Sequence, residues 1–248
     1  MPLRLTPAVR LILFICVGAF LFQNIADQFF GFNVLELFAL VPTGFVVQHR
    51  LWQIFTYSFL HADVLHILLN MLMLVFTGAE LEASWGTRRF VIYYAVCSTF
   101  AGVCYLLMQI FSSSGAGLGT PMIGASGAIY GLLIAYGILF GERVMLFMML
   151  FPMKAKHFIW ILAGVEFFTA AFSRKGGLSS VAHLGGMFGG FMYLMARARW
   201  NIWQRDKKNR PVKPSRKKNA HLKLVVNNPK AFEGDPDDRE GKGPKTWH

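Results

Sequence analysis

The chain has 248 residues, of which 54% are hydrophobic and only 15% are charged, against roughly 25% charged residues in soluble domains. The formal net charge is +12, but residues 197–248 alone hold 15 Lys and Arg against 6 Asp and Glu, which gives +9. This composition excludes an ordinary soluble domain. The confinement of positive charge to one end is typical of membrane-surface charge, so we expect no nucleic-acid partner. Binding of nucleic acid by the basic tail stays open as an alternative.

The sequence predicts an all-α membrane protein with six transmembrane helices, at residues 8–26, 64–82, 90–110, 124–140, 158–172 and 181–197. Residues 27–57 are too apolar for a free loop, and we expect them to lie partly in the membrane interface. Residues 144–153 are apolar but too short to span, so we expect them along the surface. The six-helix domain then covers residues 1–200, and residues 201–248 form a basic, disordered cytoplasmic tail.

Lys and Arg residues set the expected orientation. With the N-terminus inside, 22 of them are cytoplasmic, and only Arg50, Arg174 and Lys175 are outside. Because cytoplasmic loops carry the excess of positive charge, both termini are expected to be cytoplasmic. We expect an integral multi-pass protein of a bacterial inner membrane.

Polar side chains lie inside three of the spans, and each needs a structural or functional explanation because such groups are costly in lipid. The second span carries His66 and Asn70, the fourth Ser126 and Tyr130, and the sixth His183. At about 1.5 Å per residue, His66 and Ser126 stand roughly 24 Å, and His183 roughly 21 Å, above the cytoplasmic ends of their spans. Three helices therefore bring polar groups to a similar level.

A serine, a histidine and an asparagine at one level indicate nucleophilic acyl transfer. His183 can take the proton of Ser126 as the hydroxyl attacks, and return it to the leaving amine. The Asn70 amide, the Ser126 backbone N–H and His66 can stabilise the oxyanion. Taken singly, Ser126 could bond to its own helix backbone and Asn70 could join two helices.

Two carboxylates inside the apolar segments receive structural interpretations. We find no Asp or Glu at the level of His183, so the pattern predicts a Ser–His dyad with Tyr130 packed against the imidazole. Glu166 in the fifth span is interpreted as a structural or cavity-lining carboxylate. Glu82 is expected to pair with Arg88 or Arg89 at a helix end.

Together these residues resemble the rhomboid family of intramembrane proteases over about residues 52–195. The matching motifs are GxSG at Gly124, Ser126 and Gly127, continued by Tyr130; AHxxGxxxG at Ala182, His183, Gly186 and Gly190; and HxxxN at His66 and Asn70. GxSG alone is a weak signal, but three motifs on three spans in the family's order are a strong one. One departure is Gln53 after Trp52, where the family often has arginine.

The resemblance implies an intramembrane serine endopeptidase that cuts within or near transmembrane segments, with Ser126 and His183 as the catalytic pair. It also implies a mobile cap at residues 173–180 and a lateral gate at the fifth span. Transmembrane proteins and the lipid bilayer are the expected partners, while the oligomeric state stays open. HExxH and metal-ligand cysteine spacings are missing from the sequence, so we expect no metal and no cofactor. The alternative is a non-catalytic relative that binds transmembrane clients.

Overall fold

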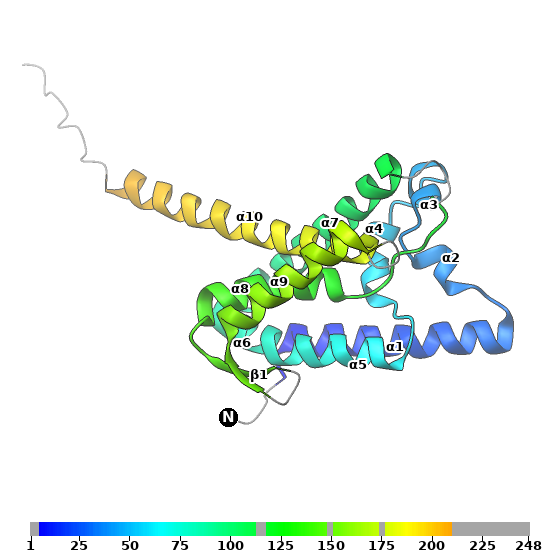
Figure 1. Ribbon diagram of the computed structural model, residues 1–248, viewed down its shortest axis with the longest axis horizontal. Helices are drawn as coiled ribbons and strands as arrows, with labels where there is room; N and C mark the ends of the chain where they lie inside the picture. The colour runs from blue at the N-terminus through cyan, green and yellow to red at the C-terminus, as the bar shows by residue number, and fades with distance from the viewer. Residues whose placement is uncertain (1–4, 113–117, 148–150, 174–176, 210–248) are drawn as a thin grey trace, which may run out of the picture. The chain divides into compact units, whose positions relative to one another are not determined.

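The computed structural model describes residues 5–112, 118–147, 151–173 and 177–209, and Met1–Arg205 belong to one compact unit. Figure 1 shows that most of the described elements are helices. The long helices are α1 (Pro7–Phe30), α7 (Thr87–Ser112), α8 (Ser126–Phe140), α9 (Ala155–Phe172) and α10 (Gly177–Lys208). A further helical run joins α5 (Val64–Met73), the π-helical turn η2 (Leu74–Gly78) and α6 (Ala79–Trp85).

The described helices coincide with all six expected spans, and four of them are long and apolar enough to cross a membrane. These four are Pro7–Phe30, Val64–Trp85, Thr87–Phe111 and Ala155–Phe172. An all-α multi-pass membrane protein is thus confirmed. α8 has only 15 residues and α10 is not among these four helices, so the number six stays a prediction. α10 also continues past the expected boundary at residue 200. The expected disordered tail began at residue 201, but residues 201–208 belong to α10; for residues 210–248, which lie outside the described residues, disorder stays a prediction.

The segment 144–153, expected along the surface, contains two paired strands. β1 (Val144–Phe147) pairs antiparallel with β2 (Phe151–Lys154), and Val144 lies opposite Lys154. Glu142, two residues before β1, accepts hydrogen bonds from Lys154 Nζ at 2.7 Å and from Lys156 Nζ. These two ammonium groups lower the pKa of Glu142 to about 2. An apolar run of ten residues fits a helix or paired strands equally, and here backbone pairing decides the outcome.

The connection 27–57 folds into short helices, α2 (Val34–Phe38), α3 (Pro42–Val46) and α4 (Gln53–Thr56), followed by the 3₁₀ turn η1 (Tyr57–Phe59). Gln53 organises this region from a fully buried position. Its Nε2 donates to the carbonyls of Glu36 (3.2 Å) and Leu37 (3.3 Å), and its Oε1 accepts from the Val41 amide (3.2 Å). A glutamine thus anchors the loop at the position where the family often has arginine.

Glu82 does not form the ion pair expected from the sequence. Its buried carboxylate accepts hydrogen bonds from the amides of Ala8 (2.9 Å) and Val9 (3.0 Å), and from the hydroxyls of Thr6 and Thr87. Those amides are the unpaired donors at the start of α1, where a negative charge is favourable. Glu82 therefore caps a helix that lies more than 70 residues away in sequence.

Glycines allow the helices around the site to approach closely. A Cβ atom on Gly186 of α10 would overlap the carbonyl oxygen of Gly127 on α8. A Cβ on Gly131 would overlap Cys97 of α7 and lie 3.0 Å from the carbonyl of Gly186. The GxxxG spacing in both helices thus serves backbone contact, and it fixes α8 against α10 at the level of the candidate site.

Candidate active site

Ser126 is the first residue of α8, and the glycine two residues earlier shapes the turn into that helix. Gly124 has φ = 116°, a conformation that side chains disfavour, and its amide donates to the carbonyl of Tyr57 at 3.0 Å. A Cβ at this position would lie 2.8 Å from Nε2 of His66. Gly124 is therefore required both by the backbone angle and by the imidazole beside it.

His183 faces Ser126 across the contact between α8 and α10. The Nε2 atom of His183 lies 2.8 Å from Oγ of Ser126, and both residues are half-buried. The ring of Tyr130, one helical turn after Ser126, stacks on the imidazole with centroids 4.2 Å apart and planes 7° apart. This stacking restricts rotation of the imidazole, so Nε2 stays directed at the serine hydroxyl. The arrangement can transfer a proton between the two side chains.

Backbone donors surround the serine because it begins a helix. The first hydrogen bond of α8 runs from the Ile129 amide to the Ala125 carbonyl at 3.1 Å. The amides of Ser126, Gly127 and Ala128 precede it and have no partner within the helix. They point toward the side from which the helix begins, where the helix dipole favours negative charge. An oxyanion formed on a carbonyl bound at Ser126 would meet these donors.

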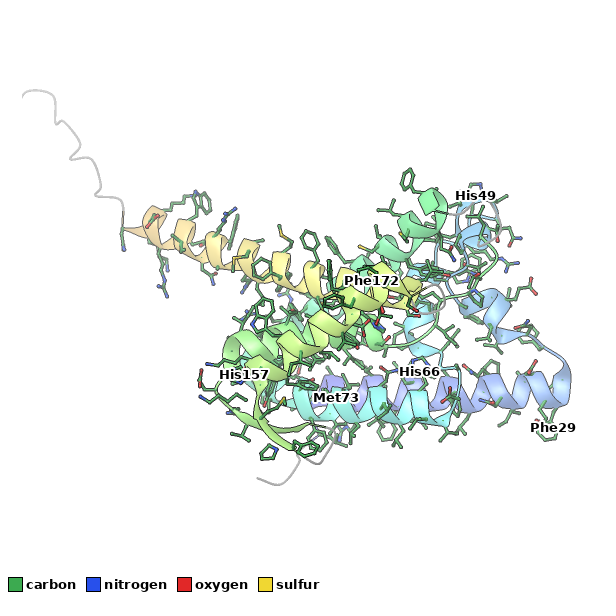
Figure 2. All side chains as sticks on the ribbon, in the orientation of Figure 1. Phe29, His49, His66, Met73, His157 and Phe172 are labelled. Carbon is green, nitrogen blue, oxygen red and sulfur yellow. The ribbon has the colours of Figure 1, made fainter. Side chains whose placement is uncertain are left out.

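His66 and Asn70 lie on one face of α5 and line a cavity of about 890 Å³ together with Tyr130 of α8. Figure 2 labels His66 near the start of α5 and Met73, which also lines the cavity, further along the same helix. The remaining walls are mostly apolar and come mainly from α5, α8 and α9, including Leu133, Phe158 and Val165, with Phe76, Glu80 and Val144 from η2, α6 and β1. The structure therefore places both predicted oxyanion residues on the wall that faces α8.

Glu166 corrects the expectation that no carboxylate accompanies His183. Its Oε1 lies 3.0 Å from Nδ1 of His183, and it accepts a hydrogen bond from the hydroxyl of Tyr130. Ser180 is a further hydrogen-bond partner of this buried carboxylate. The contact with Nδ1 has the distance of a hydrogen bond but not its alignment, so we describe it as a close charge contact. The signal in the sequence was the presence of an acidic residue within a span.

Comparison with known proteins gives consistent matches. The family profile of the Rhomboid domain matches residues 48–200. RHOMBOID-like protein 1 of Arabidopsis thaliana is 33% identical over 167 residues, which cover 64% of this chain and 38% of that protein. Rhomboid protease GlpG of Enterobacter sp. (strain 638) is 28% identical over 140 residues, 56% of this chain and 46% of that protein. Rhomboid-like protease 3 of Toxoplasma gondii is 31% identical over 84 residues, 34% of this chain and 29% of that protein. The chain thus spans less than half the length of each of these curated relatives.

Proposed function

Since this chain belongs to the rhomboid family, as the match over residues 48–200 shows, we propose that it is an intramembrane serine endopeptidase. It cleaves peptide bonds in or near transmembrane segments of membrane proteins. The observation that carries the proposal is the 2.8 Å distance between Oγ of Ser126 and Nε2 of His183. Similarity to proteins named as proteases in a bacterium and in Toxoplasma gondii supports the same class of reaction.

The first half of the reaction forms an acyl-enzyme. Oγ of Ser126 attacks the carbonyl carbon of the scissile bond while its proton moves to Nε2 of His183. A new O–C bond forms, and the negative charge passes to the carbonyl oxygen. The C–N bond then breaks, and the proton on Nε2 goes to the leaving amine. In the second half, water attacks the ester, gives a proton to Nε2, and Ser126 recovers its proton as the carboxylic acid leaves.

The oxyanion is stabilised by donors that are in place before the substrate arrives. The amides at the start of α8, the Asn70 side chain and His66 are the candidates, and Gly124 leaves the room that His66 occupies. Loss of a single donor of this kind costs about 10²- to 10³-fold in kcat in serine proteases. Asn70→Ala is therefore expected to lower kcat by about 10²-fold with a smaller change in KM.

A transmembrane substrate must expose a peptide bond at Ser126. A helical peptide bond is shielded by its own hydrogen bonds, so local unwinding precedes attack, and residues with poor helix propensity such as glycine lower that cost. The apolar cavity bounded by α5, α8 and α9 supports entry of a hydrophobic segment from the lipid side. α9 has only 17% of its apolar window buried, in agreement with its assignment as the lateral gate.

The membrane arrangement belongs to the same proposal. Six spans, counting α8 and the apolar part of α10, place both termini in the cytoplasm by the distribution of Lys and Arg. Ser126 and His183 then lie nearer the outer face, from which water can enter. A mobile cap was expected at residues 173–180; residues 177–180 instead form the start of α10, and residues 174–176 lie outside the described residues. Relatives come from bacteria, a plant and a parasite, so the bacterial inner membrane stays a prediction.

A fluorophosphonate probe and a fluorogenic single-span substrate test the proposal on the purified full chain in detergent micelles. We expect the wild type to be labelled and to cleave the substrate, and Ser126→Ala and His183→Ala to lose cleavage. Ser84→Ala is the matched control, because it removes an exposed hydroxyl bonded to the Leu81 carbonyl. Cleavage retained in Ser126→Ala would refute the mechanism and favour the client-binding alternative.

A further inference from the structure

Glu166 is a buried carboxylate in the middle of an apolar helix, where an unpaired charge is expensive. The rest of the mechanism does not use it. Only 10% of its side chain is exposed, and it lies against the imidazole of His183, of which 18% is exposed. A buried charge is tolerated when neighbouring groups stabilise it, so the contacts of Glu166 indicate its role.

The partners of Glu166 among the described residues belong to the immediate surroundings of the imidazole. Tyr130 donates its hydroxyl to Oε1 and covers the face of the His183 ring. The same Oε1 lies 3.0 Å from Nδ1, the ring nitrogen opposite to the one that faces Ser126. Three helices thus bound the imidazole: α8 provides the hydroxyl and the stacking ring, α9 the carboxylate, and α10 the histidine itself. Ser180, three residues before His183, completes the contacts of the carboxylate.

We propose that Glu166 is a positioning residue for His183 and that the protein works with a Ser–His–Glu arrangement in place of a dyad; this inference rests on the proposed function. The carboxylate beside Nδ1 favours the tautomer with the proton on Nδ1, which leaves the lone pair of Nε2 toward Ser126. When Nε2 takes the serine proton, the positive imidazolium gains a negative neighbour. Glu166 stays ionised throughout, and the proton passes only between Ser126, His183 and the leaving amine.

The imperfect alignment of the Nδ1 contact agrees with this role. Hydrogen bonds of catalytic groups are often poorly aligned without substrate and tighten in the reacting complex. At 3.0 Å the carboxylate attracts the imidazolium even while the hydrogen bond between them is poorly aligned. Tyr130 limits how far the ring can turn, because it stacks on the imidazole and holds the same carboxylate oxygen.

The test compares Glu166→Gln with wild type in the substrate assay above. Glutamine keeps the size and an acceptor for Tyr130 but removes the charge, so kcat should fall by about 10²-fold while KM changes little. The second-order rate of fluorophosphonate labelling should fall in parallel, because the probe also needs an activated serine. Glu166→Asp keeps the charge on a shorter side chain and should recover part of the lost kcat. It also provides a second variant if Glu166→Gln fails to fold.

Two controls separate positioning from a general structural role. Ser180→Ala removes one hydrogen bond from the same carboxylate without touching the imidazole, and should cost much less kcat than Glu166→Gln. In a His183→Ala background, Glu166→Gln should not change the residual rate of fluorophosphonate labelling, since its effect passes through His183. Wild-type kcat in Glu166→Gln, or an equal loss in Ser180→Ala, would overturn the inference. Either of these two outcomes would leave the proposed function intact. The proposed function fails only when Ser126→Ala still cleaves the substrate.

Discussion

The turn before Ser126 provides the sharpest test of the geometry of the site. Gly124→Ala should be costly for two independent reasons. The φ of 116° is a sparsely populated conformation for alanine, which costs about 2 kcal/mol. The new methyl would also lie 2.8 Å from Nε2 and 2.9 Å from Cε1 of His66. Displacing a packed ring by a few tenths of an ångström costs about another 2 kcal/mol. The expected total is about 4 kcal/mol in the free energy of unfolding.

A double-mutant cycle separates the two contributions. In a His66→Ala background the collision is gone, so Gly124→Ala should cost only the backbone part, about 2 kcal/mol. The assay is the free energy of unfolding in mixed micelles with increasing SDS, measured for all four proteins. Gly119→Ala is the matched control, since no atom lies within 4 Å of its Cβ position. An equal cost of Gly124→Ala in both backgrounds would refute the contact with His66.

Three further predictions concern the surroundings of the site. Gln53→Met should lower the free energy of unfolding by about 1 to 3 kcal/mol, because it leaves the amide of Val41 unpaired, whereas the carbonyls of Glu36 and Leu37 keep hydrogen bonds from Arg50 and Trp52. Exposed Gln48→Met serves as the control in the same titration. Glu82→Ala should cost about 3 kcal/mol by removing the cap of α1, and amide exchange of residues 8 and 9 should accelerate. Burial, and secondarily His66, lowers the pKa of His61 to about 4 from an ordinary 6.5. The folded state thus disfavours its protonation, and stability should be lost as the pH falls from about 6.5 toward 4. His61→Gln should show a smaller loss over that range, and identical profiles would contradict the assignment.

The sequence predicts most of the fold because the length of an apolar run is a local property. The first, third and fifth spans begin and end within a few residues of the expected positions. Features that depend on distant partners were not predictable. Glu82 caps the start of α1, more than 70 residues earlier in the sequence. The nearby Arg88 and Arg89 had suggested a local ion pair instead. The strands β1 and β2 depend on pairing with each other, which an apolar pattern does not reveal.

The site was predictable to the extent that its residues carry motifs. Ser126, Tyr130 and His183 were expected together, and the structure brings them into contact. His66 and Asn70 were expected beside them, and the structure places both on the cavity wall facing α8. The carboxylate at His183 was missed because Glu166 belongs to none of the three motifs, and the expected spans put it at a different level from His183.

The expected level of His183 relative to Glu166 was wrong for a specific physical reason. Two helices joined by a short connection run in opposite directions, so residues equally far from the turn lie at the same level. Glu166 precedes the end of α9 at Phe172 by six residues, and His183 follows the start of α10 at Gly177 by six residues. The expected sixth span began at residue 181, only two residues before His183. That start puts the two side chains about 6 Å apart in height at 1.5 Å per residue. A helix start misplaced by four residues, slightly more than one turn, therefore hid the pairing of Glu166 with His183.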